Sequence, residues 1–123
     1  MRSSGMTSTR VVKTGWFAKA ARKAHINDDG LCAAIREVML GQANDPGGGV
    51  YKKRLGKNMY RSIILAKARN FWTYEYLFAK KDRDNIDDDE LHGFRKLARH
   101  YARLIQEELA RLLRNGDLVE ICR

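Results

Sequence analysis

The sequence has little cysteine, histidine and proline, and it has no long apolar run. Its 123 residues include two cysteines, three histidines and one proline. Cys32 and Cys122 are far apart and match no metal-binding spacing, so we expect two reduced thiols. A bridge between them would require the C-terminal tail to pack on the helix that carries Cys32. His92 and His100 are eight residues apart, not the three or four that place two ligands on one helical turn. We therefore expect no metal ion and no cofactor.

The missing apolar runs exclude further classes of protein. No stretch approaches the roughly 20 apolar residues that a membrane-spanning helix needs. The first ten residues, MRSSGMTSTR, lack the apolar segment of a secretory signal, so we expect a cytoplasmic protein without a membrane partner. Residues 1–9 are small and polar, and we expect them to be disordered. The length then predicts a single domain over residues 10–123.

Acidic residues are scarce in the middle of the chain, where positive charge is concentrated. Residues 50–83 contain ten Lys or Arg and only two acids, a local charge of +8 in a chain of +9. Residues 1–26 carry +6, whereas residues 27–49 and 84–123 carry −3 and −2. This alternation indicates a basic face on a folded domain rather than a basic tail. Such a face needs a polyanionic partner, most often a nucleic acid.

Apolar spacing and capping residues predict the helices. Thr14 is a candidate N-cap after a short strand over residues 10–14, and an apolar stripe from Phe17 to Ala24 follows it. Asn27 is a second candidate N-cap, before a helix that Gly41 can end. Asp87 and Glu90 fit a capping box at the start of one long C-terminal helix that reaches residues 115–116. Residues 118–122 could then form a last edge strand.

Three strands are predicted between these helices, over residues 50–55, 60–66 and 71–79. The short connections between them predict an antiparallel meander, and residues 44–49 are predicted to be a flexible turn. Alternation along the third strand places an aromatic row on one face, more plausibly as core than as a base-stacking surface: Trp72, Tyr74, Tyr76 and Phe78. The order β-α-α-β-β-β-α-β predicts an α+β fold. Its antiparallel sheet of three to five strands would have all helices on one side and a basic concave surface on the other.

The basic residues of the meander can hold phosphate groups. The cations at converging strand ends are Lys52, Arg54, Lys57, Arg61, Lys80, Lys81 and Arg83. Lysine pairs with a phosphate as a point charge and arginine as a two-pronged fork. Composition alone favours binding without chemistry over catalysis. RNA would be the easier substrate to cleave, because its 2′-hydroxyl is an internal nucleophile. Either a lysine with a lowered pKa or Tyr60 could act as the general base.

Several segments together resemble the RelE/ParE superfamily of bacterial type II toxins. They are KTGWFAKAARKAHINDDGLCAAIREV, GGGVYKKRL, the pair Tyr60-Arg61, LFAKKDRDNIDDDEL and the terminal NGDLVEIC, which together span nearly the whole chain after residue 9. The likeness is greatest to the RelE-like, HigB-like group that is often described as phage-derived. RelE carries a tyrosine a few residues beyond the last cation, where this chain has Asn85-Ile86, and the loop over residues 56–59 is shorter than expected for this group.

The resemblance implies a toxin that cuts mRNA on the ribosome and is neutralised by an antitoxin, expected to be a helix-turn-helix protein. Lys52 and Arg54 would orient the RNA, and Arg61 would stabilise the developing charge. Lys81 or Arg83 would help the leaving group. Further RNA contacts are expected from Lys53, Lys57, Tyr60 and Lys80. The alternatives are a ParE-like gyrase inhibitor without nuclease activity and an inactive RNA-binding member.

Overall fold

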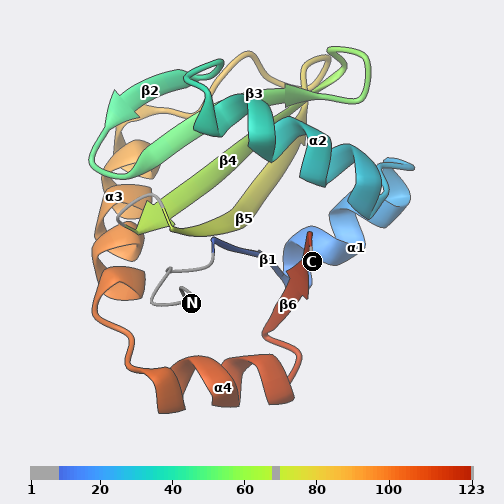
Figure 1. Cartoon of the computed structure of the whole chain (residues 1–123). Coiled ribbons are helices and arrows are strands. Elements are labelled where there is room, and N and C mark those ends of the chain that lie inside the picture. Colours follow the sequence, from blue (N-terminus) through green and yellow to red (C-terminus); the bar gives the residue numbers. More distant parts are fainter. Residues whose placement is uncertain (1–8, 68–69, 123) are drawn as a thin grey trace.

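The computed structural model describes residues 9–67 and 70–122. The predicted disordered segment, residues 1–9, lies outside this range except for Thr9. The described residues form six strands and four helices (Figure 1). In chain order they are β1 (Arg10–Thr14), α1 (Gly15–Lys23), α2 (Asp28–Met39), β2 (Asn44–Gly47), β3 (Val50–Leu55), β4 (Tyr60–Lys67), β5 (Phe71–Ala79), α3 (Asp88–Ala102), α4 (Gln106–Arg114) and β6 (Leu118–Ile121).

The α+β class is confirmed, but the sheet is larger than predicted and is mixed. Its strand order is β2-β3-β4-β5-β1-β6. The meander β3-β4-β5 is antiparallel as expected, whereas β1 runs parallel to β5 and antiparallel to β6. Residues 44–47, predicted to be a turn, form the short edge strand β2 beside β3. The partners of β1 and β2 could not be predicted, because pairing depends on where the chain returns and not on local propensity.

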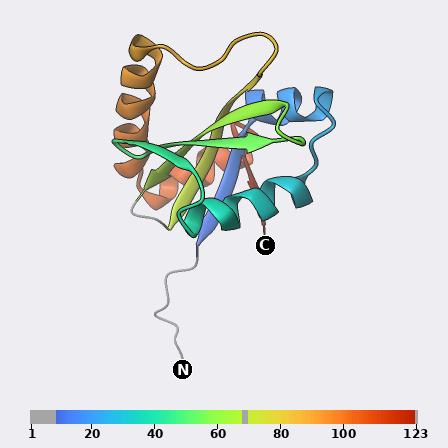
Figure 2. The ribbon, with the colours of Figure 1, turned by 90° about the horizontal axis from the view of Figure 1, so that it is seen from above.

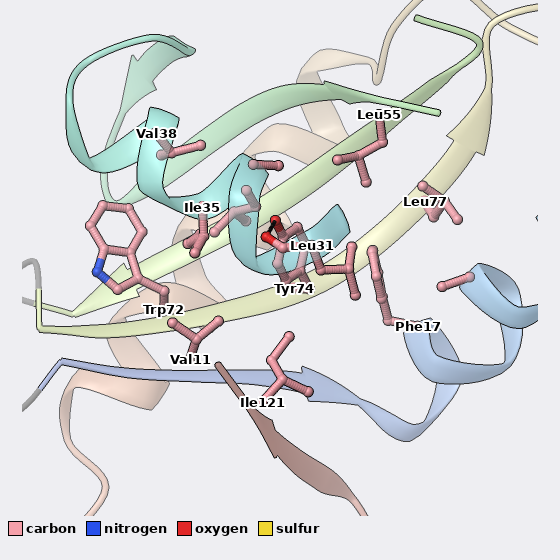
Figure 3. Packing of buried hydrophobic residues seen from close by; sticks show 13 residues of the cluster. Val11, Phe17, Leu31, Ile35, Val38, Leu55, Trp72, Tyr74, Leu77 and Ile121 are labelled. Carbon is pink, nitrogen blue, oxygen red and sulfur yellow. Dashed lines mark hydrogen bonds between the residues drawn. The ribbon is translucent and has the colours of Figure 1, made fainter. Parts of the chain in front are cut away.

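Helices cover both faces of the sheet, so the prediction that all helices lie on one side is wrong. Figure 2 shows α3 on one side of the sheet and α1 and α2 on the other. Trp72 and Tyr74 are fully buried in the main core beneath α1 and α2. In Figure 3, the hydroxyl of Tyr74 donates a hydrogen bond to the Leu31 carbonyl oxygen of α2 at 2.7 Å. Ile63 and Leu65 point to the opposite face, where they pack with α3.

A β-bulge in β5 divides the predicted aromatic row between the two faces. Ile64 pairs with Tyr74 and Ile63 pairs with Tyr76, so Glu75 is an extra residue without a partner in β4. One extra residue reverses the side-chain alternation beyond it. Tyr76 therefore packs on the α3 side, whereas Tyr74 packs on the α1–α2 side. The row is core as expected, but it does not lie on one face.

The predicted long C-terminal helix is two helices, α3 and α4. The capping box at Asp87 and Glu90 is present, with bonds of 2.7 and 2.9 Å. The chain leaves the helix after Ala102, and α4 begins after Ile105. Leucines of α4 then pack on a third core cluster, formed by Val12, Phe71 and Leu118. Tyr101 of α3 packs on the same cluster, so both helices contribute to it. The apolar periodicity alone does not reveal the break between them.

Cys32 and Cys122 form a disulfide, so the prediction of two free thiols is wrong. Pairing of β6 with β1 brings the tail back beside the core under α2, and the two Cα atoms lie 5.4 Å apart. This separation is within the range that a disulfide spans. Sequence spacing could not reveal the contact, because 90 residues separate the two cysteines.

Candidate nucleic-acid interface

Strand register places Arg54, Arg61 and Phe78 in one row across the sheet. Arg54 pairs with Arg61 across β3 and β4, and Arg61 pairs with Phe78 across β4 and β5. Directly opposed residues of neighbouring strands project from the same face. Lys52 lies two residues before Arg54 in β3 and therefore shares this face. The sheet thus gathers three of the predicted catalytic cations from two adjacent strands.

These residues line a hollow of about 410 Å³ at the β3 end of the sheet, which we call the Arg61 hollow. A hollow of this volume can hold a small ligand or one monomer of a polymeric ligand. Four cations and one carboxylate contribute to the lining, so the hollow favours an anion. The lining residues are Gln42, Ala43, Asn44, Lys52, Lys53, Arg54, Arg61, Phe78, Asp84 and Asn85.

The Arg61 guanidinium is held in place by its own hairpin. Its Nη1 donates to the carbonyl oxygens of Asn58 at 3.0 Å and Tyr60 at 3.2 Å. Within residues 9–67 and 70–122, its Nε and Nη2 have no hydrogen-bond partner. In Arg10, the same two donor atoms, Nε and Nη2, form a fork onto the two carboxylate oxygens of Glu120. Arg61 is therefore fixed on one side and open to an anion on the other.

Lys52, Arg54 and Lys53 differ in how much of their charge is available. The Nζ of Lys52 donates to Oδ1 of Asn85 at 3.1 Å, which ties β3 to the segment after β5. Arg54 is exposed and forms no ion pair with any described residue. The Nζ of Lys53 lies 2.8 Å from the Glu37 carboxylate and donates to the Gln42 carbonyl oxygen. A phosphate would therefore have to compete with the Glu37 carboxylate for the Lys53 ammonium group.

The predicted single pocket is divided, because Lys81, Arg83 and Tyr60 line a second hollow. This hollow has a volume of about 590 Å³, and we call it the Trp16 hollow. Phe78 lines both hollows, so they are neighbours. The Trp16 hollow is lined by Trp16, Lys19, Ala20, Lys23, Tyr60, Tyr76, Leu77, Phe78, Ala79, Lys81, Asp82 and Arg83.

Arg83 is engaged within the protein. Its guanidinium forks onto both carboxylate oxygens of Glu90, donates to the Asn85 carbonyl oxygen at 2.9 Å and lies over the Phe78 ring. The hydrogen bond from Arg83 holds the pKa of Glu90 below its usual value, and the same bond raises the pKa of Arg83. Lys81 is exposed and has no ion-pair partner among the described residues.

Lys57 and Lys80 line neither hollow. Lys57 lies in the β3–β4 turn with a φ of 56°, and Lys80 follows β5, where its backbone N–H donates to the Met59 carbonyl oxygen. Both side chains are exposed beside the same hairpin. They can therefore add to the positive field around the site, but the structure does not bring them to the Arg61 row.

Sequence reasoning missed several residues that shape the two hollows. Asn85 and Asp84 reach the Arg61 hollow from the segment before α3, and Trp16 reaches the other hollow from α1. Asn85 could have been suspected, because it lies where RelE has a tyrosine beyond its cations. Lys19 and Lys23 of α1 also line the Trp16 hollow, and no local pattern in the sequence places them beside β5.

A comparison with protein families matches residues 9–121 to the RelE toxin of the RelE/RelB toxin–antitoxin system. The chain belongs to the RelE toxin family. This RelE-family chain is therefore a toxin of a toxin–antitoxin system, and its partner is an antitoxin. The predicted RelE/ParE superfamily membership is confirmed, and the HigB-like subgroup stays a prediction. Searches of curated proteins and of solved structures found no match.

Two structural findings concern metal ions and membranes. Within the described part of this RelE-family chain, no three His, Cys, Asp or Glu side chains gather as a potential metal site. No helix among those residues is long and apolar enough to cross a membrane.

Proposed function

We propose that this toxin is an endoribonuclease that cleaves mRNA on the ribosome without a metal ion. The observation that supports the proposal most directly is the Arg61 hollow, where Lys52, Arg54 and Arg61 share one face. Three cations around a space of about 410 Å³ suit one phosphodiester and its flanking sugar. The Nε and Nη2 of Arg61, which have no hydrogen-bond partner among the described residues, provide a fork for the phosphate oxygens.

The proposed reaction is an internal transfer within the RNA. The 2′-oxygen attacks the adjacent phosphorus and forms a P–O2′ bond, while the P–O5′ bond breaks. A base takes the 2′-hydroxyl proton, and the departing 5′-oxygen takes a proton from an acid. The products are a 2′,3′-cyclic phosphate and a 5′-hydroxyl. Lys52 and Arg54 orient the strand, and Arg61 stabilises the extra negative charge at phosphorus.

Lys81 suits the leaving-group role better than Arg83. Arg83 is paired with Glu90, whereas Lys81 is exposed and forms no ion pair within residues 9–67 and 70–122. Lys81 lines the neighbouring hollow, which meets the Arg61 hollow at Phe78. An ammonium group there could neutralise the 5′-oxygen as its bond to phosphorus breaks.

Replacement of Arg61 tests the proposal. We expect Arg61→Ala to lower cleavage about 100-fold, the usual cost of removing one donor that stabilises a transition state. Arg61→Lys should recover only part of this loss, because lysine lacks the fork. The measurement is primer extension on a transcript that is translated in vitro with purified toxin, beside the same transcript without ribosomes. Growth after induction of each variant gives a second readout.

Arg99→Ala is the matched control, because Arg99 is an exposed arginine of α3 that lines neither hollow. It should cut like the wild type. Thermal unfolding of Arg61→Ala shows whether loss of the bonds to Asn58 and Tyr60 has unfolded the hairpin. Arg54→Ala avoids that difficulty, since the Arg54 side chain forms no hydrogen bond with a described residue, and the variant should cut about tenfold more slowly. Intact transcripts together with inhibited gyrase supercoiling would instead support the ParE-like alternative.

We further propose that the antitoxin is a helix-turn-helix protein that covers the cationic row. The edge of β6 is a second contact candidate, because β6 ends the sheet and its Val119 is exposed. An unpaired strand edge can accept a strand from a partner. A neighbouring short reading frame with a helix-turn-helix pattern, co-purifying with this chain, would support the proposal. A neighbour of another fold that neutralises the toxin would overturn it.

A further inference from the structure

The Trp16 hollow lies where β5 loses its strand neighbour on one side. β1 pairs with β5 only from Phe71 to Tyr74, and α1 begins directly after β1 ends. Beyond the Glu75 bulge, β5 continues past the end of β1, with α1 alongside it (Figure 1). Four consecutive residues, 76–79, line the hollow, which is the pattern expected when a strand is approached along its edge.

Trp16 gives this hollow an aromatic surface that the fold buries only in part. Its indole stacks on the Tyr76 ring, with centroids 5.1 Å apart and an interplanar angle of 21°. Tyr76 in turn packs against Phe78 and Phe94, which anchors the stack to the core. Trp16 is nevertheless 53% exposed, so about half of its surface remains accessible beside the stack with Tyr76. A rigid, half-exposed indole is well suited to stack against a planar ligand.

Lysines surround the indole and are not neutralised. Lys19 and Lys23 are four residues apart in α1, so they lie on one side of the helix, and Lys81 faces them from the end of β5. All three are exposed, and none forms an ion pair with a residue in 9–67 or 70–122. Asp82 is the one carboxylate among the lining residues, against four cations. The hollow therefore combines an aromatic surface with excess positive charge.

We infer that the Trp16 hollow binds unpaired nucleotides of RNA, with a base stacked on Trp16 and phosphates held by Lys19, Lys23 and Lys81. Aromatic stacking between cations is the combination by which proteins hold single strands. The choice of RNA rests on the proposed function. Because Phe78 lines both hollows, a strand whose phosphate is in the Arg61 hollow can continue into this one. An acidic peptide would pair with the lysines, but its carboxylates would make no stacking contact with the exposed indole of Trp16.

Binding of a non-cleavable RNA tests the inference apart from catalysis. The probe is a fluorescein-labelled octauridine with 2′-O-methyl groups, which blocks the 2′-oxygen and removes any cleavage. Its anisotropy is followed with the purified full chain at several salt concentrations. We expect Trp16→Ala to raise Kd about tenfold, the loss of one stacked base. Trp16→Phe keeps a ring in place and should raise Kd by no more than about threefold.

Lys23→Ala tests the phosphate contacts, and Arg22→Ala is its matched control. Arg22 is the preceding residue of α1, is also exposed and lines a different hollow. Lys23→Ala should reduce the slope of log Kd against log salt by about 0.7, the value for one phosphate contact on a single strand. Arg22→Ala should leave the slope within experimental error. Thermal unfolding of each variant separates lost binding from lost folding.

The outcomes distinguish this inference from the proposed function. Equal effects of Lys23→Ala and Arg22→Ala, together with unchanged Kd in Trp16→Ala, would overturn the Trp16 hollow as an RNA site, even if Arg61→Ala abolished cleavage. Octaglutamate binding that equals octauridine binding and depends equally on Trp16 would also overturn it and would point to an acidic protein partner. Binding that depends on Trp16 and Lys23 would support the inference even if the toxin did not cleave the translated transcript in the primer-extension experiment.

Discussion

The extra residue of the β5 bulge, Glu75, is a carboxyl group in an unusual place. It is half-buried on the α3 side, where the Tyr101 hydroxyl donates to its Oε1 at 3.1 Å. Burial raises the pKa of Glu75 to about 7, although the hydrogen bond from Tyr101 acts in the opposite direction. Burial also raises the pKa of Tyr101, and the nearby carboxylate adds to that rise. Near neutral pH the protein therefore contains a partly protonated acid inside its fold.

The raised pKa of Glu75 makes the stability of the fold depend on pH. The folded protein binds the Glu75 proton more tightly than the unfolded chain, so this contribution to stability is complete at acidic pH. It is lost as pH rises from about 4.5 to about 7. Glu75→Gln removes the titration and keeps a polar partner for Tyr101. We expect the free energy of unfolding of the variant, taken relative to that of the wild type, to increase by on the order of 2 kcal/mol from pH 4.5 to pH 8. Urea unfolding at both pH values measures it.

Glu107→Gln is the control for this measurement, because Glu107 is exposed in α4. Its stability relative to the wild type should not depend on pH in the same way. Equal pH dependence of Glu75→Gln and the wild type would show that Glu75 does not carry the effect.

The N-caps were predictable at the scale of single residues. Oγ1 of Thr14 accepts from the Phe17 N–H at 3.0 Å, and Oδ1 of Asn27 accepts from the Gly30 N–H at 2.9 Å. These contacts join residues three apart, so sequence spacing already contains the geometry. The Asp87 capping box is confirmed for the same reason. The environments of Glu75 and Arg83 were not predictable, because their partners are placed by packing.

At the scale of elements, the β2–β3 turn depends on a contact with α3. Arg95 donates from Nη2 to the Pro46 carbonyl oxygen at 2.6 Å and from Nε to the Gly47 carbonyl oxygen at 3.2 Å. Gly48 has a φ of 72°, and a Cβ there would lie 2.7 Å from Cγ of Arg95. Only glycine meets both requirements at low cost. This turn sets the position of β2, whose residue Asn44 lines the Arg61 hollow.

Gly48→Ala should therefore destabilise the protein by about 1–2 kcal/mol, because it combines a left-handed backbone with a close contact. Gly93→Ala is the control within α3. A Cβ at Gly93 meets no atom within 4 Å, and alanine should stabilise the helix by about 0.5–1 kcal/mol. Urea unfolding measures both changes. Opposite signs are expected for the two variants, and a Gly48→Ala variant as stable as the wild type would contradict the steric constraint at this turn.

At the scale of the whole molecule, the Cys32–Cys122 disulfide ties the last strand to the second helix. It closes a loop of 90 residues, and a loop of this length gives a stabilisation of about 4.5 kcal/mol in the chain-entropy account. We expect the double variant Cys32→Ala/Cys122→Ala to unfold at a temperature about 17 °C lower, because the lost stabilisation is divided by the unfolding entropy of a chain of this length. Differential scanning calorimetry measures the change.

A reducing agent provides the internal control for this prediction. It should lower the unfolding temperature of the wild type toward that of the double variant, and it should have no effect on the double variant itself. A wild type that is indifferent to reduction and retains two titratable thiols would show that the bond does not form in solution.

The sequence by itself determined the properties that depend on near neighbours: the helix caps, the β3-β4-β5 meander, the α+β class and the basic stretch. Each follows from spacings of a few residues, because helices and hairpins are built from local contacts. Only the tertiary structure decided the place of β1 between β5 and β6, the helices on both faces and the Cys32–Cys122 bond. It also divided the predicted cations between the Arg61 and Trp16 hollows. One bulge residue reverses the side-chain alternation along the rest of a strand, and long-range pairing decides which elements meet.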